Sequence, residues 1–538
     1  MKTTPTRLVV LSALFMTVFL NWAFFRNAIA AFAQQPDGYL HIASLAALLL
    51  CLMILILGLL AAGRAIKPVL IVLLIIGAGT AYFMDTYNVI IDSGMINNTM
   101  STDWAETRDL ITPRLLLYLG AFGLLPSWFI WKIRIERGTL GHALRARAAL
   151  ILVALACIGA LLFASSSFYA PYFREHKALR YYSNPLTPLY SLVHYLGNLN
   201  DNEPREVAAI GTDARIVEPD SEPHPDHELV IMVVGETARA DRFSLNGYAR
   251  ETTPELAARH VISFTHMSSC GTSTAVSVPC MFAIYDHDSF SDGKAKVTQN
   301  VLDILARAGV NVLWRDNNSS SKGVANRIRH EDYRNADNNP VCDSECRDVG
   351  MLDGLQAYID QHADGDILIV LHQMGSHGPA YYKRYPNTYR RFRPTCDTSQ
   401  LDTCTPESIS NTYDNTILYT DHFLGEAIDL LRGNDAQFET ALLYVSDHGE
   451  SLGEAGVYLH GLPYFIAPDA QTHVAAVMWL GEHFEDIDSN ALQHIADDPL
   501  SHDNLFHTLL GLFEVRSSVY DPQRDILQIA RTAEKSAP

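Results

Sequence analysis

The chain has 538 residues, a length that suggests two or more domains. Its net charge of −20 at pH 7 argues against nucleic acid as a partner, because a surface of that sign repels phosphate groups. Hydrophobic residues make up 48% of the chain, but they are unevenly spread. The first third holds long runs almost free of charge, whereas the rest has the composition of a soluble domain.

Five apolar runs in the first third are long enough to cross a membrane. At a rise of about 1.5 Å per residue, each run can span a hydrocarbon core of about 30 Å as a helix. The runs lie at about residues 7–25, 40–62, 67–84, 115–131 and 149–169. The first run lacks a small-residue cleavage site, so we interpret it as a retained anchor rather than a signal peptide.

The loops between these runs predict the orientation of the chain. Residues 132–147 carry five Lys or Arg against one Glu, whereas the charged residues in 85–112 are mainly acidic. Basic loops stay in the cytoplasm, so we expect the N-terminus there and everything after the fifth run outside. We therefore predict a multi-pass protein of the bacterial inner membrane with a periplasmic C-terminal part.

Cysteine usage gives independent support for this orientation. Six of the eight cysteines lie beyond the fifth run in close pairs: Cys270 with Cys280, Cys342 with Cys346, and Cys396 with Cys404. Short-range pairs of this kind are typical of disulfides in an oxidising compartment. Zinc binding by these cysteines is the weaker alternative, because no pair has the CxxC spacing of a zinc ribbon.

The composition also predicts where the domains divide. The segment 169–199 is aromatic and amphipathic, as expected of helices at a membrane surface, and the segment 215–228 is a linker rich in Pro, Asp and Glu. We expect a five-helix transmembrane domain at 1–170, interfacial helices and a linker at 171–227, and a periplasmic domain at 228–538.

Apolar runs alternate with longer helical stretches in the periplasmic part. They lie at residues 229–235, 309–314, 366–372, 441–446 and 474–480. Because these runs are unbroken rather than alternating, they predict strands that are covered on both faces. The expected fold class is therefore α/β with a mostly parallel sheet, in which ligands gather at the carboxyl ends of the strands.

Carboxylate and imidazole residues follow three of these strands. Glu236 follows the first strand, His377 lies shortly after the third, and Asp447 and His448 follow the fourth. Taken singly, His377 or His460 is more often an ordinary surface histidine. Because parallel strands bring their ends to one edge, these residues together predict a cluster of oxygen and nitrogen ligands that suits zinc.

The segment CGTSTAVSVPC from Cys270 supplies hydroxyl groups. Thr272, Ser273 and Thr274 stand at the start of a predicted helix, where unpaired backbone N–H groups and the helix dipole stabilise a phosphate. Helix capping is the alternative explanation for these side chains. Next to zinc, one of these hydroxyls would have a lowered pKa and act as a nucleophile, but composition does not select which one.

Five motifs in this order carry a family resemblance. They are GETARADRFSLNGY from Gly235, CGTSTAVSVPC from Cys270, WRDNNSSSKG from Trp314, LHQMGSHGP from Leu371 and YVSDHGESLGE from Tyr444. With the five membrane runs, they resemble the phosphoethanolamine transferases that modify lipid A, a group that includes the mobile colistin-resistance enzymes. The resemblance covers nearly the whole chain and implies a periplasmic domain of the alkaline phosphatase and sulfatase type.

The resemblance assigns roles to individual residues. It implies that Thr274 is the nucleophile, and that the zinc ligands are Glu236, Thr274, Asp447 and His448. It implies one zinc ion, or two if His377 and His460 hold a second zinc rather than the phosphoryl group. The residues that correspond to substrate-binding positions are Asn318 and Lys322 and, more loosely, Asn98 and Glu106.

The mechanism implied by the resemblance is a double displacement. Thr274 attacks phosphatidylethanolamine and releases diacylglycerol, and a lipid A phosphate then attacks the phosphoethanolamine-threonine, while His377 or His460 moves the proton. The product carries less negative charge, which weakens its attraction to polymyxins. The expected partners are these two lipids and the surrounding membrane lipids, and the protein is expected to be a monomer.

Other functions are weighed against this one. A phosphoglycerol transferase or a phosphohydrolase could use the same metal core. The sulfatase branch is disfavoured, because the segment around Cys270 lacks the Pro and Arg of the C/S-x-P-x-R motif. A non-enzymatic receptor or transporter is disfavoured because the membrane runs hold few ionisable groups, which transport pathways usually need.

Overall fold

The computed structural model describes residues 2–101, 104–136, 138–199, 206–217, 227–484, 487 and 489–536. The chain forms two compact units. The first unit comprises residues 1–96 and 110–199, and the second unit comprises residues 97–109 and 200–538. The finer division at residues 170 and 227 stays a prediction.

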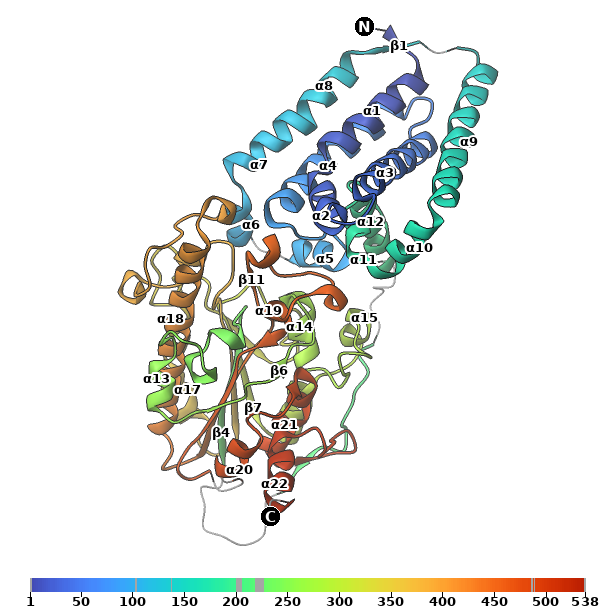
Figure 1. Ribbon diagram of the computed structural model, residues 1–538. Helices are drawn as coiled ribbons and strands as arrows, with labels where there is room; N and C mark the ends of the chain where they lie inside the picture. The colour runs from blue at the N-terminus through green and yellow to red at the C-terminus, as the bar shows by residue number, and fades with distance from the viewer. Residues whose placement is uncertain are drawn as a thin grey trace. The chain divides into compact units, whose positions relative to one another are not determined.

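Apolar helices lie side by side in the first unit (Figure 1). Four segments are long and apolar enough to cross a membrane: α3 (Gly38–Leu60), α4 (Ile66–Tyr87), the segment Pro113–Lys132, and α9 (Leu140–Ala164). The third of these consists of α7 (Pro113–Tyr118), a π-helical turn (Leu119–Leu124) and α8 (Leu125–Lys132). A fifth span is counted only if α1 (Pro5–Phe19) and α2 (Trp22–Phe32), bent by 58°, form one crossing.

This bend differs from the straight span that we expected at residues 7–25. The Asn21 side chain lies between the two helices and donates to the carbonyls of Met16, at 2.9 Å, and Asn184, at 2.7 Å. Its Oδ1 accepts the Asn184 N–H at 2.8 Å. A buried amide must be hydrogen-bonded, so the helix breaks where Asn21 finds these partners. Hydrophobicity alone does not reveal such a break.

Shorter elements connect the longer ones. Helices α5 (Ser93–Ser101) and α6 (Trp104–Leu110) follow α4, and the amphipathic segment after α9 forms α10 (Ser166–Glu175), α11 (Lys177–Tyr181) and α12 (Leu186–Leu199). Strand β1 (Lys2–Thr3) pairs with β2 (Arg134–Ile135) in the first unit. Of the expected linker, residues 218–226 lie outside the described part of the chain, and Arg215–Ile216 is strand β3, paired with β16 (Val515–Arg516).

A seven-stranded sheet with the order β5-β14-β10-β4-β9-β7-β8 forms the centre of the second unit. Its parallel strands are β4 (Glu228–Gly235), β7 (Asn311–Asp316), β8 (Arg329–Asp332), β9 (Ile367–His372) and β10 (Glu439–Ser446). At one edge, β14 (Ala476–Leu480) and β5 (Ile262–Ser263) pair in antiparallel fashion. The prediction of a mostly parallel sheet is therefore confirmed.

The run at 474–480 is divided rather than forming one strand. Strand β13 (His473–Val474) joins a separate sheet with β6 (Met267–Ser268) and β15 (Leu500–Ser501), whereas β14 joins the main sheet. Between them, Ala475 donates its N–H to the Ala238 carbonyl at 3.0 Å and accepts the Ser446 N–H at 2.9 Å. These bonds hold Ala475 out of both ladders.

Both faces of the main sheet are covered, which explains its unbroken apolar strands. In β4, Val230 and Met232 enter one hydrophobic core, and Leu229 and Ile231 enter another. The first core includes α14 (Thr274–Met281), α16 (Val301–Ala308), α20 (Ser489–His494), α21 (Leu505–Leu512) and α22 (Ile526–Ser536). The second includes α13 (Pro254–Ala258), α17 (Leu355–Gln361) and α18 (Pro406–Arg432), and Figure 1 shows α18 and α21 on opposite sides of the strands.

The remaining helices and strands of the second unit are short. They are α15 (Asp292–Lys296), α19 (Asp469–Thr472), β11 (Ser451–Leu452) and β12 (Tyr458–Leu459). The three predicted disulfides are confirmed: Cys270–Cys280, Cys342–Cys346 and Cys396–Cys404. Cys51 and Cys157 in the apolar helices remain thiols.

A side chain at Gly235 is expected to destabilise the second unit. A Cβ atom there would lie 2.5 Å from Cε2 of the buried Tyr444 ring. Overpacking of this kind costs about 1–3 kcal/mol, so Gly235→Ala should lower the Tm of the full-length protein in detergent micelles. In a Tyr444→Leu background the same change should cost less, because the ring is gone. Equal costs in the two backgrounds would contradict this packing explanation.

Candidate active site

The pairing of β4 with β10 brings two carboxylates together. The two strands are parallel, and Ser446 at the end of β10 pairs with Gly235 at the end of β4. The next residues along the two strands are Asp447 and Glu236, and the Asp447 N–H donates to the Gly235 carbonyl at 2.9 Å. The register of the sheet therefore places both carboxylates at one edge, as the strand-end argument predicts.

Glu236, Asp447 and His448 form a compact cluster with no exposed side-chain surface. Their ligand atoms all lie within 4.8 Å of one another. His448 Nε2 is 3.4 Å from Glu236 Oε1 and 3.4 Å from Asp447 Oδ2. Asp447 Oδ2 is buried without a hydrogen-bond partner in the described part of the chain. Such an atom needs a compensating cation, and this set of oxygen and nitrogen atoms suits a divalent metal.

The orientation of His448 also suits metal binding. Its Nδ1 lies 2.9 Å from the Gly449 carbonyl, which only accepts, so Nδ1 carries the proton and Nε2 presents its lone pair to the cluster. Burial lowers the pKa of His448 well below its ordinary value, which keeps the imidazole neutral. Burial raises the pKa of Asp447, and a bound cation would oppose that shift.

The structure distinguishes the hydroxyl of Thr274 from that of Thr272, which composition alone does not. Thr274, the first residue of α14, places Oγ 3.1 Å from Glu236 Oε2 and 3.3 Å from His448 Nε2. The Thr272 hydroxyl instead donates to the Leu462 carbonyl at 2.7 Å. Thr274 thus supplies the hydroxyl that lies against the cluster, where a metal ion could activate it.

Two further residues of interest lie in the segment after β7. Asn318 is buried, and its Nδ2 donates to Glu236 Oε2 at 2.6 Å and to the Gln373 carbonyl at 2.7 Å. Lys322 donates to Ser319 Oγ at 2.5 Å, and its φ of 50° lies in the left-handed region. Asn318 therefore touches the cluster directly, whereas Lys322 stands on a tight turn four residues further on.

The two predicted histidines lie beside the cluster. The His460 ring centroid is 4.3 Å from that of His448 and 5.6 Å from that of His377. Burial, together with the positive charge of Arg384, lowers the pKa of His377 well below its ordinary value. The His460 ring thus lies between the other two imidazoles in this chain of contacts, and burial keeps His377 neutral.

Glu450 is a site residue that the sequence reasoning missed. Its Oε2 lies 2.8 Å from His460 Nδ1, and its Oε1 accepts the Tyr381 hydroxyl at 2.5 Å. With His448 and His460 it forms a second group of potential metal ligands. The available signal was its position three residues after Asp447 in the motif YVSDHGESLGE.

Asn98 and Glu106 are placed less fully. Asn98 lies in α5 and Glu106 lies in α6. The Glu106 side chain is outside the described part of the chain. The expected roles of both residues in substrate binding stay predictions.

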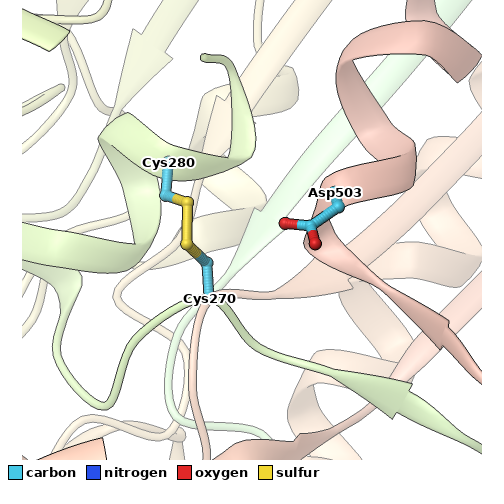
Figure 2. Close-up of side chains that lie close together, drawn as sticks. All are labelled: Cys270, Cys280 and Asp503. Carbon is cyan, nitrogen blue, oxygen red and sulfur yellow. A yellow bond between two sulfur atoms is a disulfide. The ribbon is translucent and has the colours of Figure 1, made fainter. Parts of the chain in front are cut away.

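A third group of close side chains is not a metal site. Figure 2 shows Cys270 and Cys280 joined by a disulfide beside the carboxylate of Asp503. Sulfur atoms in a disulfide do not offer the thiolate that binds metal. Asp503 Oδ1 accepts the His287 N–H at 2.8 Å, so this carboxylate has a structural partner.

Comparison with known proteins agrees with this arrangement. Residues 228–515 match the sulfatase family model, and residues 49–199 match the model described as phosphoethanolamine transferase EptA/EptB. The phosphatidylethanolamine transferase Mcr-2 of Escherichia coli is 43% identical over 95% of each chain. The phosphoethanolamine transferase EptA of Escherichia coli strain K12 is 41% identical over 97% of this chain and 96% of that one.

A solved structure extends the similarity to the fold of both units. It is the integral membrane protein lipooligosaccharide phosphoethanolamine transferase A of Neisseria meningitidis, which is 34% identical and has a TM-score of 0.93 over 98% of this chain and 99% of that chain. The protein is thus an inner-membrane protein with a periplasmic domain of the alkaline phosphatase and sulfatase type. From these matches, the chain belongs to the phosphoethanolamine transferase family.

Proposed function

We propose that this protein transfers phosphoethanolamine from phosphatidylethanolamine to a lipid A phosphate, with Thr274 as the nucleophile and zinc as the metal. The observation that carries the proposal is the position of Thr274 Oγ, 3.1 Å from Glu236 Oε2 and 3.3 Å from His448 Nε2. The names of the relatives at 43% and 41% identity support the transferred group.

Four residues would hold the zinc ion: Glu236, Thr274, Asp447 and His448. When bound, zinc lowers the pKa of a hydroxyl and offsets charge on phosphoryl oxygens. The group formed by His448, Glu450 and His460 could hold a second ion. The steps proposed below require the first ion only.

In the first displacement, Thr274 Oγ attacks the phosphorus of phosphatidylethanolamine, and the bond from phosphorus to the glycerol oxygen breaks. The glycerol oxygen takes up a proton, and diacylglycerol leaves. His377 or His460 moves the proton. Asn318 and Lys322 are assigned to the phosphoethanolamine that remains on Thr274.

In the second displacement, an oxygen of a lipid A phosphate attacks the same phosphorus. Thr274 Oγ leaves and regains its proton, which restores the starting state. Both substrates are lipids, which explains why one chain combines membrane helices with a phosphoryl-transfer domain. The product carries an added amine, so we expect weaker binding of polymyxins and resistance to them. We further propose that the protein works as a monomer.

Thr274→Ala is expected to lower the rate of lipid A modification about 1,000-fold or more, because no hydroxyl then lies against Glu236 and His448. Thr272→Ala is the matched control, since it removes a hydroxyl from the same segment that instead donates to Leu462. Mass spectrometry of lipid A from cells expressing each variant measures the added phosphoethanolamine. Equal modification by both variants contradicts the assignment of the nucleophile, and addition of phosphoglycerol by the wild type favours the alternative activity.

Asp447→Asn is expected to lose bound zinc, because it removes one of the two buried carboxylate ligands. Asp503→Asn is the matched control, since its carboxylate lies beside a disulfide rather than in the cluster. Elemental mass spectrometry should find about one zinc per chain in wild type and control, with a chelator lowering their Tm. Wild-type zinc content in Asp447→Asn would show that the ligand set is wrong.

A further inference from the structure

A large pocket lies in the second unit, and none of the four proposed metal ligands lines it. It has a volume of about 850 Å³, near the upper end of the range of about 300–1,000 Å³ for ligand sites. Its walls come from Asn97 of α5 and from residues 275–285, 292–300 and 320–330. A site of this size accommodates a group larger than phosphoethanolamine.

The pocket adjoins the nucleophile. Ala275, which directly follows Thr274 in α14, forms part of its wall, as does Pro279 one turn further along. Lys322 and Gly323 also line the pocket, with left-handed φ values of 50° and 93°. Strained backbone of this kind persists where surrounding structure holds it and gathers at binding sites. The same segment begins at Asn318, which touches Glu236, so pocket and cluster share two elements.

The charges around the pocket favour an anion. Lys296, Lys322, Arg327 and His330 contribute positive or protonatable groups, and Asp292 contributes a negative one. Arg327 is already paired with Asp303 through two hydrogen bonds of 2.7 and 2.6 Å.

Lys296 differs from Arg327 in its interactions. Among the described residues it makes no hydrogen bond or ion pair within 4 Å, and Asp292, on the same short helix, instead accepts the Asn97 amide at 2.9 Å. Lys296 interacts electrostatically with the Asp292 carboxylate, but an incoming anion would find its ammonium group without a hydrogen bond among the described residues.

The uncharged groups of the pocket favour a sugar. Amide and hydroxyl side chains line it: Asn97, Thr298, Gln299, Asn300, Ser320 and Asn326. Such groups both donate and accept hydrogen bonds, as sugar hydroxyls do. Apolar residues also line the pocket, among them Ala275, Pro279 and Val324, so it offers a sugar both hydrogen bonds and contacts for its C–H groups.

We propose that this pocket binds the phosphorylated sugar of the lipid acceptor and presents its phosphate to the phosphoethanolamine carried by Thr274. The assignment rests on the proposed function and adds a place for the second substrate. A sugar held beside Ala275 would be close to the neighbouring Thr274. Binding would then replace a bimolecular encounter by a reaction between groups that are already positioned, which lowers the entropic part of the barrier.

The first test compares Lys296→Gln with Lys294→Gln in the full-length, zinc-loaded protein in liposomes that contain phosphatidylethanolamine. Lys294 lies on the same helix and carries the same charge, but it does not line the pocket and donates to the Ser289 carbonyl. Loss of one charge-assisted contact should raise the KM for lipid A about 10-fold in Lys296→Gln relative to the control. The rate of diacylglycerol release without acceptor should change less.

A second readout separates the pocket from the proposed function. Binding of glucosamine 1-phosphate is measured by calorimetry on both variants, with inorganic phosphate and glucosamine as single-group probes. Glucosamine 1-phosphate should bind more tightly than either single group, and Lys296→Gln should weaken it about 10-fold against Lys294→Gln. The pocket assignment is overturned if the two variants bind glucosamine 1-phosphate with equal affinity. It is also overturned if inorganic phosphate binds as tightly as glucosamine 1-phosphate. A wild type that releases diacylglycerol but leaves lipid A unmodified overturns the proposed function instead.

Discussion

The burial of two carboxylates beside one imidazole is the constraint on which the rest of the site depends. Glu236 and Asp447 lie at paired strand ends, and neither side chain has exposed surface. Burying a charge costs several kcal/mol unless an opposite charge offsets it. A bound divalent cation would provide that charge, so in the proposed mechanism the stability of the cluster and the activation of Thr274 have one physical cause.

Residues outside the cluster limit how far the proton-moving groups can shift. Glu450 Oε2 lies 2.8 Å from His460 Nδ1, and the hydrogen bond between them fixes the orientation of the imidazole ring. Asp348 accepts two backbone N–H groups at 2.9 and 3.1 Å in the loop that ends at His377. Both carboxylates are buried, so water competes little for these hydrogen bonds. Fixed donors and acceptors of this kind reduce the reorganisation required when charge moves in the reaction.

The fold class and the proximity of Glu236, Asp447 and His448 could be predicted from sequence because both depend on local patterns. Unbroken apolar runs reveal strands covered on both faces, and Glu236 and Asp447 directly follow two of them. The identity of the hydroxyl was out of reach from composition, because the difference between Thr272 and Thr274 depends on Leu462, which is distant in sequence. The family resemblance implies Thr274 as the nucleophile, and its contacts with Glu236 and His448 support that proposal.

Other features depend on long-range contacts that leave no periodic trace. The break in the first apolar run depends on Asn21 meeting Asn184, across 163 positions of sequence. The pocket is assembled from four separate segments, each of which alone has an ordinary polar composition. Such features follow from how the elements pack, so a pattern read along one segment does not contain them.

The net charge of the chain has the same sign as the charge of its proposed acceptor, lipid A. At −20, the protein repels anionic lipids at long range, but salt screens this repulsion beyond about 10 Å. The pocket beside Thr274 has the opposite sign at short range, through Lys296 and Lys322. An anionic acceptor therefore gains affinity only on contact, so selection depends on the positions of its phosphate and hydroxyl groups rather than on long-range attraction.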